Sequence, residues 1–250
     1  MNSPIGWIGG KRALRKEIIE LFPQEGVGRY IEVFFGAGWV FFGREKQPGQ
    51  LEVINDRDGQ IVNLFRCIKY HRAALQEELE WLVSALEIFF AAMAQLHTDG
   101  LTDIQRAARF FYVLKNSFGS NQKTFATSGN GIGCSIDYLE QVQLRLKGVK
   151  IENRDFEPIL KTYDRPDALF YLDPPYLGTE KLYEGIFGWE DHLRLGAKLK
   201  GRFVLSYNDD PRIRELYCDW CDIKATARRE TLSGAGKNQS SFKEIIIRNY

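Results

Sequence analysis

The sequence is poor in the residues that bind metal ions or form disulfide bridges. It has three histidines and four cysteines in 250 residues. Cys218 and Cys221 form one CxxC motif, but no second CxxC or HxxxH motif completes a zinc-binding set with Cys67 or Cys134. We therefore expect no metal site, and thiols that stay reduced, as is usual in cytoplasmic proteins.

Long apolar runs and an excess of one charge are also missing. The longest apolar run, around residues 86–94, is about half of the roughly 18 residues that a membrane-spanning helix needs. The first residues lack the charged segment and apolar run of a signal peptide. The 34 Lys and Arg residues nearly balance the 33 Asp and Glu residues, so any contact with phosphates must be local. These absences favour a soluble cytoplasmic protein over a membrane protein or a histone-like polycation.

The sequence does contain alternating strand and helix patterns, within a globular composition of 44% hydrophobic and 27% charged residues. Short β-forming runs predict strands at residues 29–34, 51–55, 148–152, 168–172, 202–206 and 243–249. Helices are predicted over residues 58–69, 72–96, 102–115 and 189–200, and a mobile loop over residues 116–133. This alternation predicts a mostly parallel α/β sheet, with ligands bound beyond the carboxyl ends of its strands.

Two glycines and an acidic residue follow the first two predicted strands. Gly36 and Gly38 suit a tight strand-to-helix turn, and Asp56 lies 20 residues after Gly36. A carboxylate there can accept hydrogen bonds from both hydroxyls of a ribose, although a helix cap would also explain it. Phe41 occupies the place of the third glycine of a dinucleotide-binding GxGxxG motif. S-adenosylmethionine, which has a ribose and no pyrophosphate, fits this pattern better than a dinucleotide.

The tetrapeptide Asp173-Pro174-Pro175-Tyr176 directly follows the predicted strand 168–172. Its prolines stiffen the turn and offer carbonyl groups without N–H donors. Asp173 and the Pro174 carbonyl group can both accept hydrogen bonds from one amino group, and Tyr176 offers a face for stacking a base. The alternative is an ordinary turn with a packed tyrosine. The position after a strand favours a site that holds an exocyclic amine for methyl transfer.

Together these motifs resemble the DNA adenine N6-methyltransferases of the Dam type, the D12 class, found in bacteria and their phages. The resemblance spans almost the whole chain, and the motifs occur in the family's order. They are Trp7-Ile8-Gly9-Gly10-Lys11, Glu32-Val33-Phe34-Phe35-Gly36-Ala37-Gly38, Asn55-Asp56, Asp155-Phe156, Asp173-Pro174-Pro175-Tyr176 and the strand of residues 244–250. The resemblance implies a Rossmann-like methyltransferase fold, with residues 1–58 and 148–250 binding the cofactor and residues 59–147 forming a helical target-recognition insertion.

The resemblance also implies roles for individual residues. Trp7 and Lys11 would contact the methionine end of the cofactor, and Asp56 would hold its ribose. Asp155 would accept a hydrogen bond from the cofactor's adenine while Phe156 packs on that ring. Three further positions would line the same pocket, namely Glu32 and the turn from Phe34 through Gly36 to Gly38. Asp173 and Tyr176, with Pro174 and Pro175 between them, would hold the target adenine.

A pocket of this kind requires the target base to be flipped out of double-stranded DNA. The candidates for gripping the opened duplex are Lys123 and Phe125 in the loop, and Arg228, Arg229 and Lys237 near the second Gly/Ser-rich segment. Only residues 116–153 fill the interval in which the best-known members carry a longer base-reading hairpin. Recognition of GATC is therefore not implied, and a different, shorter or relaxed target is open, as is a role in restriction-modification. The alternatives are methylation of cytosine N4 or of an RNA amine, and a catalytically silent DNA-binding relative.

Overall fold

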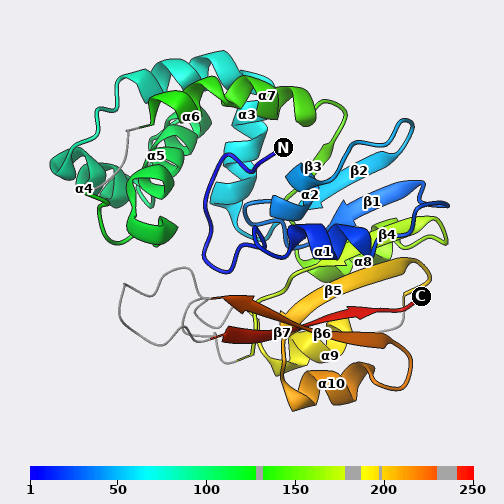
Figure 1. The fold of residues 1–250 in the computed structure, drawn as a ribbon. Helices are drawn as coiled ribbons and strands as arrows, with labels where there is room; N and C mark the ends of the chain where they lie inside the picture. The colour runs from blue at the N-terminus through cyan, green and yellow to red at the C-terminus, as the bar shows by residue number, and fades with distance from the viewer. Residues whose placement is uncertain (128–131, 178–186, 197–198, 230–240) are drawn as a thin grey trace. The chain divides into compact units, whose positions relative to one another are not determined.

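The computed structural model describes all residues except 128–131, 178–186, 197–198 and 230–240, and the chain divides into two compact units (Figure 1). The first, which we call the helical unit, consists of Met1–Arg12, Gly36–Lys46 and Asp56–Asn153. The second, the sheet unit, consists of Ala13–Phe35, Gln47–Asn55 and Arg154–Tyr250. The helical unit thus contains the predicted insertion 59–147 together with two earlier segments of the chain.

The sheet unit holds six of the seven strands of the sheet, in the order β2-β1-β4-β5-β7-β6. The strands are β1 (Arg29–Glu32), β2 (Leu51–Asn55), β4 (Ala168–Leu172), β5 (Arg202–Asn208), β6 (Asp222–Arg229) and β7 (Ser241–Arg248). β1 pairs in parallel with β2 and with β4, and β4 pairs in parallel with β5. β7 is antiparallel to both β5 and β6. The prediction of a mixed α/β fold with a mostly parallel sheet is confirmed.

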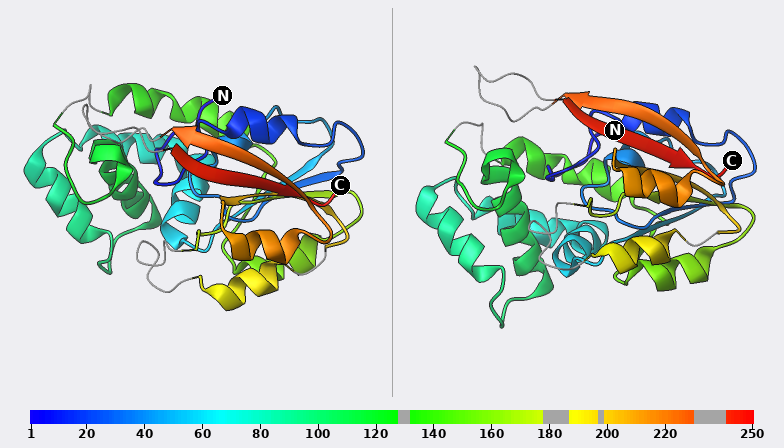
Figure 2. Two further views of the ribbon diagram at one scale, coloured as in Figure 1. Left: turned by 60° about the horizontal axis from the view of Figure 1, so that its bottom comes forward. Right: turned by 90° about the horizontal axis from the view of Figure 1, so that it is seen from below.

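The described residues of the sheet unit form four helices: α1 (Arg15–Glu20), α8 (Phe156–Tyr163), α9 (Trp189–Leu195) and α10 (Pro211–Tyr217). Figure 2 shows α8, α9 and α10 on one face of the sheet and α1 on the other. Side chains of α8, α9 and α10 share one buried cluster with alternate residues of the strands, including Phe170 and Phe203. On the opposite face, Phe22 packs against Tyr30 and Tyr171. Both faces are therefore covered, as a parallel sheet requires.

Helices make up most of the helical unit. Its elements are α2 (Trp39–Gly43), α3 (Gly59–Glu80), α4 (Leu86–Gln95), α5 (Asp103–Asn116), the 3-10 turn η1 (Phe118–Ser120), α6 (Gly133–Asp137), α7 (Leu139–Arg145) and the strand β3 (Lys150–Glu152). α5 begins with a capping box, in which Thr102 and Gln105 satisfy each other's backbone N–H groups. The predicted boundary between helices at residues 69–72 coincides with a kink, because the backbone of His71 is non-helical and separates two helical segments of α3. The prediction of one helix over residues 72–96 is wrong, since the helix is interrupted between Glu80 and Leu86, where Ala85 takes an extended conformation.

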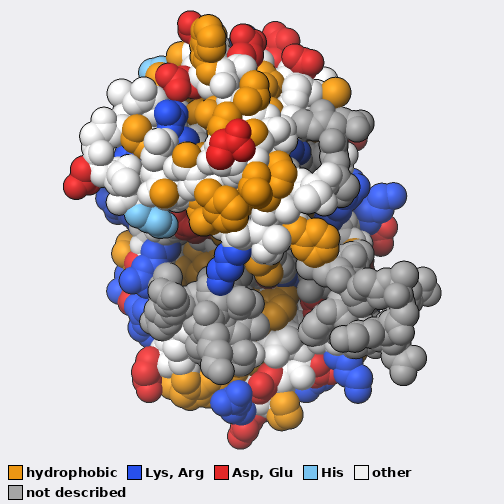
Figure 3. Space-filling model, turned by 90° about the vertical axis from the view of Figure 1, so that its left-hand side faces the viewer, with side chains coloured by type: hydrophobic (Ala, Val, Ile, Leu, Met, Phe, Trp, Pro, Cys, Tyr) orange, Lys and Arg blue, Asp and Glu red, His pale blue; other side chains and the backbone are white. Residues whose placement is uncertain are grey.

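α4 exposes apolar side chains. Figure 3 shows apolar side chains gathered on the face of the molecule that carries this helix. Trp81, Val83, Leu86 and Phe90 are all exposed, and Trp81 keeps 81% of its surface accessible. Phe89, on the other side of α4, is fully buried. The apolar run at residues 86–94 is thus one short amphipathic helix. None of the helices within the described ranges has both the length and the apolar character needed to cross a membrane.

The predicted loop 116–133 is partly ordered by hydrogen bonds. Ser117 and Phe125 form an isolated antiparallel bridge. The N–H of Phe118 donates to the Thr124 carbonyl group at 2.8 Å, and the N–H of Ala126 donates to the Asn116 carbonyl group at 2.7 Å. α6 already begins at Gly133. The segment up to residue 126 is therefore a hydrogen-bonded turn built on the end of α5, and its predicted mobility stays a prediction.

Candidate active site

The turn after β1 has the backbone conformation for which the sequence suggested glycines. Gly36 has φ of 49° and Gly38 has φ of 67°, a left-handed region that side chains disfavour. A Cβ atom at position 36 would also lie 3.3 Å from Trp7 Cδ1. Gly38 is the N-cap of α2. The glycines thus allow both the turn and the close approach of Trp7, a predicted cofactor contact.

Asp56 fixes this turn through its side chain. Its Oδ2 accepts a hydrogen bond from the N–H of Gly36 at 2.7 Å, and its Oδ1 accepts one from the N–H of Asp58 at 2.9 Å. Burial raises the pKa of Asp56 to about 6, although these N–H donors act in the opposite direction. The helix cap is a different residue, since Asp58 caps α3 by accepting from the N–H of Gln60. The reading of Asp56 as a helix cap is therefore wrong.

The N-terminal segment packs against the same turn within the helical unit. Ser3 Oγ donates to the Ala37 carbonyl group, and the ring of Trp7 meets Phe110 edge to face at 6.4 Å between centroids. The Lys11 side chain is only 4% exposed, and its Nζ donates to the Gly9 carbonyl group at 3.1 Å. Trp7 is thus held beside the glycine turn, and Lys11, the other predicted cofactor residue of this segment, is buried in the same unit.

In the sheet unit, Asn55 connects the ends of three segments. Its Nδ2 donates to the carbonyl groups of Val33 at 2.9 Å and Arg154 at 3.0 Å, and its Oδ1 accepts from the N–H of Arg154 at 3.0 Å. Asn55 is 2% exposed, so these bonds satisfy a buried amide. The sequence places Asn55 next to Asp56 but does not predict that its side chain joins Val33 and Arg154, because a sequence does not show the long-range partners of an amide.

The other predicted cofactor residues of this unit are largely buried. Glu32 is 1% exposed and accepts a hydrogen bond from the Tyr30 hydroxyl group at 2.6 Å. Phe156 is 4% exposed and packs against Phe34, with 5.8 Å between the ring centroids. Asp155 caps α8 by accepting from the N–H of Glu157 at 3.1 Å. Asp155 and Phe156 thus have structural tasks in addition to any contact with a ligand.

The Asp173–Tyr176 tetrapeptide follows β4 as predicted, and neighbouring strands hold it. Ser206 Oγ of β5 donates to Asp173 Oδ1 at 3.0 Å. The Tyr207 hydroxyl group accepts from the N–H of Leu177 at 2.8 Å and donates to the Pro175 carbonyl group at 3.2 Å. The rings of Tyr176 and Tyr207 pack with centroids 4.9 Å apart. Two successive residues of β5 therefore support the loop with their side chains, Ser206 by binding the side chain of Asp173 and Tyr207 by binding backbone groups of the loop.

Tyr176 has a second partner on β7. Its hydroxyl group donates to Glu244 Oε2 at 3.3 Å, and Glu244 is 1% exposed. Ser206, Tyr207 and Glu244 were missed as candidates. The sequence offered only one signal for them, which is that polar residues interrupt the apolar pattern of two predicted central strands.

The predicted DNA contacts differ in their surroundings. Lys123 is exposed, in a turn where its N–H donates to Asn121 Oδ1 at 2.8 Å. Phe125 is half-buried and packs on Phe89 of α4, with 5.5 Å between centroids. Arg228 lies in β6, and Lys237 lies outside the described residues. Lys123 is thus exposed to solvent, whereas Phe125 has a packing role.

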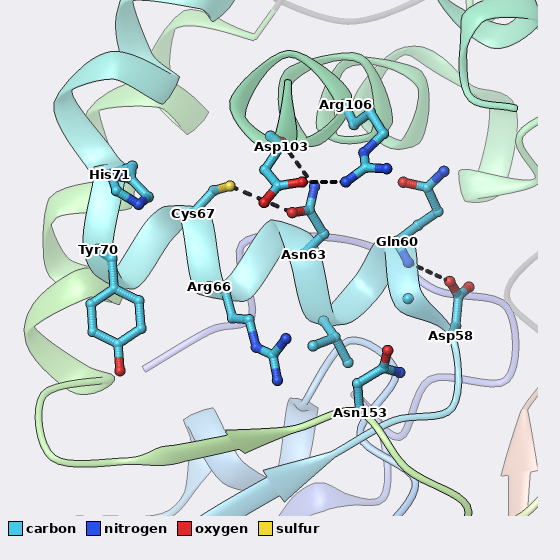
Figure 4. Close-up of a pocket in the computed structure, with 12 residues that line it drawn as sticks. Asp58, Gln60, Asn63, Arg66, Cys67, Tyr70, His71, Asp103, Arg106 and Asn153 are labelled. Carbon is cyan, nitrogen blue, oxygen red and sulfur yellow. Dashed lines mark hydrogen bonds and ion pairs between the residues drawn. The ribbon is translucent and has the colours of Figure 1, made fainter. Parts of the chain in front are cut away.

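A cavity of about 590 Å³ lies in the helical unit, along the first half of α3 (Figure 4). Asn63 Nδ2 donates to the Asp103 carbonyl group at 2.8 Å, and Arg66 donates to the Ile151 carbonyl group at 2.9 Å. The cavity's lining includes Asp58 and Asn153, which also contact Asp56. None of the predicted site residues lines it. Among the described residues there is no group of three or more side chains suited to holding a metal ion.

The family model for D12 class N6 adenine-specific DNA methyltransferases matches residues 7–232. The chain belongs to this family. The match begins at Trp7 and includes the glycine turn, Asp56 and the Asp173–Tyr176 tetrapeptide. The mixed sheet, with antiparallel β7 beside β5, is consistent with the Rossmann-like methyltransferase fold expected of a D12-class protein.

This D12-class chain is also similar to a curated protein named modification methylase StsI, from Streptococcus sanguinis. The two sequences are 24% identical over 212 residues, which cover 76% of this chain and 31% of the relative. The chain therefore spans about a third of the length of the relative.

Proposed function

We propose that this protein transfers a methyl group from S-adenosylmethionine to N6 of an adenine in double-stranded DNA. The observation that carries the proposal is the Asp173–Tyr176 tetrapeptide, held by β5 and β7 at the carboxyl end of β4, in a chain of the D12 class. The family supports an adenine substrate, and the described residues supply the acceptors and the ring that such a substrate needs.

The cofactor proposal rests on donors and acceptors present in each unit. In the helical unit, both oxygens of Asp56 are fixed by backbone N–H groups, so the carboxylate is already oriented for the two hydroxyls of a ribose. In the sheet unit, the carboxyl groups of Glu32, Asp173 and Glu244 all lie close enough to Tyr171 to raise the pKa of its hydroxyl group. Three carboxylates around one side chain favour a ligand with positive charge, such as a sulfonium. When bound, S-adenosylmethionine supplies an electrophilic methyl group.

The proposed chemistry at the target needs no covalent intermediate on the enzyme. Asp173 and the Pro174 carbonyl group accept hydrogen bonds from the amino group of the adenine, whose lone pair is otherwise delocalised into the ring. These acceptors would hold the nitrogen pyramidal, with its lone pair directed at the electrophilic methyl group that bound S-adenosylmethionine would supply. The carbon–sulfur bond would break as the carbon–nitrogen bond forms, so that a neutral thioether leaves, and the hydrogen-bonded Asp173 carboxylate would be placed to accept the proton that the nitrogen loses. Tyr176, fixed by Tyr207 and Glu244, offers a ring against which the flipped base stacks.

The remaining residues are proposed for binding and selectivity. Trp7, Lys11, Glu32 and Phe34 contact the methionine part of the cofactor, while Asp155 and Phe156 contact its adenine. Lys123, Arg228 and Lys237 bind phosphates of the duplex, and Phe125 supports the opened strand. The proposed DNA substrate is consistent with activity in the cytoplasm.

A tritium-transfer experiment tests the proposal. The purified protein is incubated with S-adenosylmethionine labelled in its methyl group and with duplex DNA, single-stranded DNA or RNA, and the product is digested to nucleosides for mass spectrometry. We expect N6-methyladenine from duplex DNA, and at least about 100-fold less of it with the Asp173→Ala variant. N4-methylcytosine or a labelled RNA nucleoside would instead establish one of the alternative substrates. No incorporation into any of them would identify a silent relative.

The target sequence needs a separate measurement. Expression in a methylation-free host, followed by single-molecule sequencing of its genome, maps every modified adenine and its neighbours. A single short motif in the mapped positions would show sequence-specific recognition. Methylation spread over unrelated sequences would show that recognition is relaxed.

A further inference from the structure

We propose that Ser206 is a positioning residue for methyl transfer, which holds the Asp173 carboxylate in its reactive orientation as the middle member of a buried hydrogen-bonded chain from Tyr171. This inference rests on the proposed role of Asp173 at the target amine. It concerns a residue that lies outside all the sequence motifs of the site.

The sheet places the three residues side by side. Tyr171 is in β4 and Asp173 follows two positions later, so their side chains point to the same face of the sheet. In the parallel pairing of β4 with β5, Leu172 stands opposite Leu205, and the next position on each strand brings Ser206 beside Asp173. The distances are 2.9 Å from the Tyr171 hydroxyl oxygen to Ser206 Oγ, and 3.0 Å from Ser206 Oγ to Asp173 Oδ1.

The number of hydroxyl protons determines which group donates in each of the two hydrogen bonds. A serine hydroxyl group carries one proton, and an ionised carboxylate can only accept. Ser206 therefore donates to Asp173, and its oxygen accepts from the hydroxyl group of Tyr171. Burial, with the nearby carboxylates, raises the pKa of Tyr171 well above its usual value, so this hydroxyl group keeps its proton at any working pH. The order is Tyr171 to Ser206 to Asp173.

Burial restrains the hydrogen-bonded side chains of Tyr171 and Ser206. Ser206 is 0% exposed and Tyr171 is 3% exposed, whereas Asp173 is only half-buried. Water cannot readily replace the serine hydroxyl group, so its loss removes the hydrogen bond to Oδ1. The carboxylate is then held less firmly and presents its oxygens to the target amine at a less well-defined angle. A misplacement of about 1 Å can reduce a reaction rate by about 100-fold.

The test is a mutant cycle read out as the single-turnover rate of tritiated methyl transfer to duplex DNA. We expect Ser206→Ala to be about 10- to 100-fold slower than the wild type, with the dissociation constant for S-adenosylmethionine unchanged within about twofold. Ser206→Ala added to Asp173→Ala should change the rate by less than about twofold, because the group that the serine orients is then absent. A merely structural role for Ser206 would slow both backgrounds by the same factor.

Tyr171→Phe provides a second variant that removes only one oxygen atom. We expect it to be about 3- to 10-fold slower, since Ser206 keeps its proton but loses the donor that orients it. Tyr217→Phe is the matched control: Tyr217 is 2% exposed in the same unit and packs against Phe203 and Trp220. It should retain the wild-type rate.

Two results would overturn the inference. One is a wild-type rate in both Ser206→Ala and Tyr171→Phe, and the other is an equal effect of Ser206→Ala with and without Asp173. Failure of the proposed function would differ from these, because Asp173→Ala itself would then retain activity. A silent Asp173→Ala with a fully active Ser206→Ala would remove Ser206 from the mechanism and leave the proposed function intact.

Discussion

Asp56 and Asp173 each follow a parallel strand, but the chain holds their carboxylates in different ways. Asp56 follows β2 and is bound by two backbone N–H groups, those of Gly36 and Asp58. Asp173 follows β4 and is bound by the side-chain hydroxyl group of Ser206. Backbone donors fix a carboxylate as rigidly as the turn itself, whereas a side-chain donor can be removed by one substitution. The comparison indicates that recognition at Asp56 depends on backbone geometry and that the chemistry at Asp173 depends on side chains.

The largest expected effect is on the rate after loss of Asp173. Asp173→Ala should reduce methyl transfer by at least about 100-fold, because the carboxylate acts on the target amine. Cofactor affinity, measured by calorimetry, should stay close to that of the wild type. A variant that keeps more than a tenth of the wild-type rate would remove Asp173 from the proposed mechanism.

Loss of Asp56 should instead act on cofactor binding. Asp56→Ala should weaken S-adenosylmethionine binding by about 1.5–3 kcal/mol, because the ribose hydroxyls lose a charged acceptor. Asp58→Ala is the matched control: it removes the cap of α3 and should cost about 1 kcal/mol of stability while leaving cofactor affinity unchanged. Calorimetry gives the affinities and thermal unfolding gives the stabilities. Equal affinity losses in the two variants would show that Asp56 acts only through the turn.

The raised pKa of Asp56 predicts that cofactor binding depends on pH. The folded, cofactor-free protein binds a proton at Asp56 with a pKa of about 6, and only the ionised carboxylate accepts from both ribose hydroxyls. Affinity for S-adenosylmethionine should therefore be constant above pH 7 and about tenfold weaker at pH 5. Asp56→Asn should bind weakly with no such dependence. A wild-type affinity that stays flat from pH 7 to pH 5 would contradict the proposed contact.

The smallest expected effect concerns Lys123, which belongs to neither carboxylate site. Lys123→Ala should lower the slope of log affinity for duplex DNA against log salt concentration by about 0.9, the value for one phosphate contact. Cofactor affinity and thermal stability should not change, because the side chain is exposed. Phe125→Ala, by contrast, should lower stability through its lost packing on Phe89. An unchanged slope would exclude Lys123 from the DNA contact.

The sequence predicted the strands better than the helices. β2 and β4 have the predicted bounds, because each is a short apolar run with a clear end. β6 was missed, since its sequence DIKATARR is too polar to signal a strand, and it is held by pairing with β7. The kink at His71 lies at the predicted boundary between helices, but the break between α3 and α4 was not predicted, because no glycine or proline marks residues 81–85. Pairing across the sheet and packing between helices decided these cases, and neither is visible in a local pattern.

The predicted site residues divide in a similar way. The glycine turn and the place of the tetrapeptide after β4 follow from local signals, and the structure shows both. The supporting residues Asn55, Ser206 and Glu244 could not be predicted, because each contacts a segment that is distant in the sequence. Phe156 was a candidate for stacking, but its burial against Phe34 depends on the packing of α8, which a motif does not report.

The place of β7 in the sheet has a consequence for synthesis on the ribosome. β7 lies between β5 and β6, and its Ile245 and Ile247 are fully buried, yet it is translated after both neighbours. Until it emerges, the nascent chain presents β5 with an unpaired edge and β6 with no partner. Such an edge is a template for association between chains. The protein therefore depends on its last strand to end a period in which the growing polypeptide is exposed to aggregation.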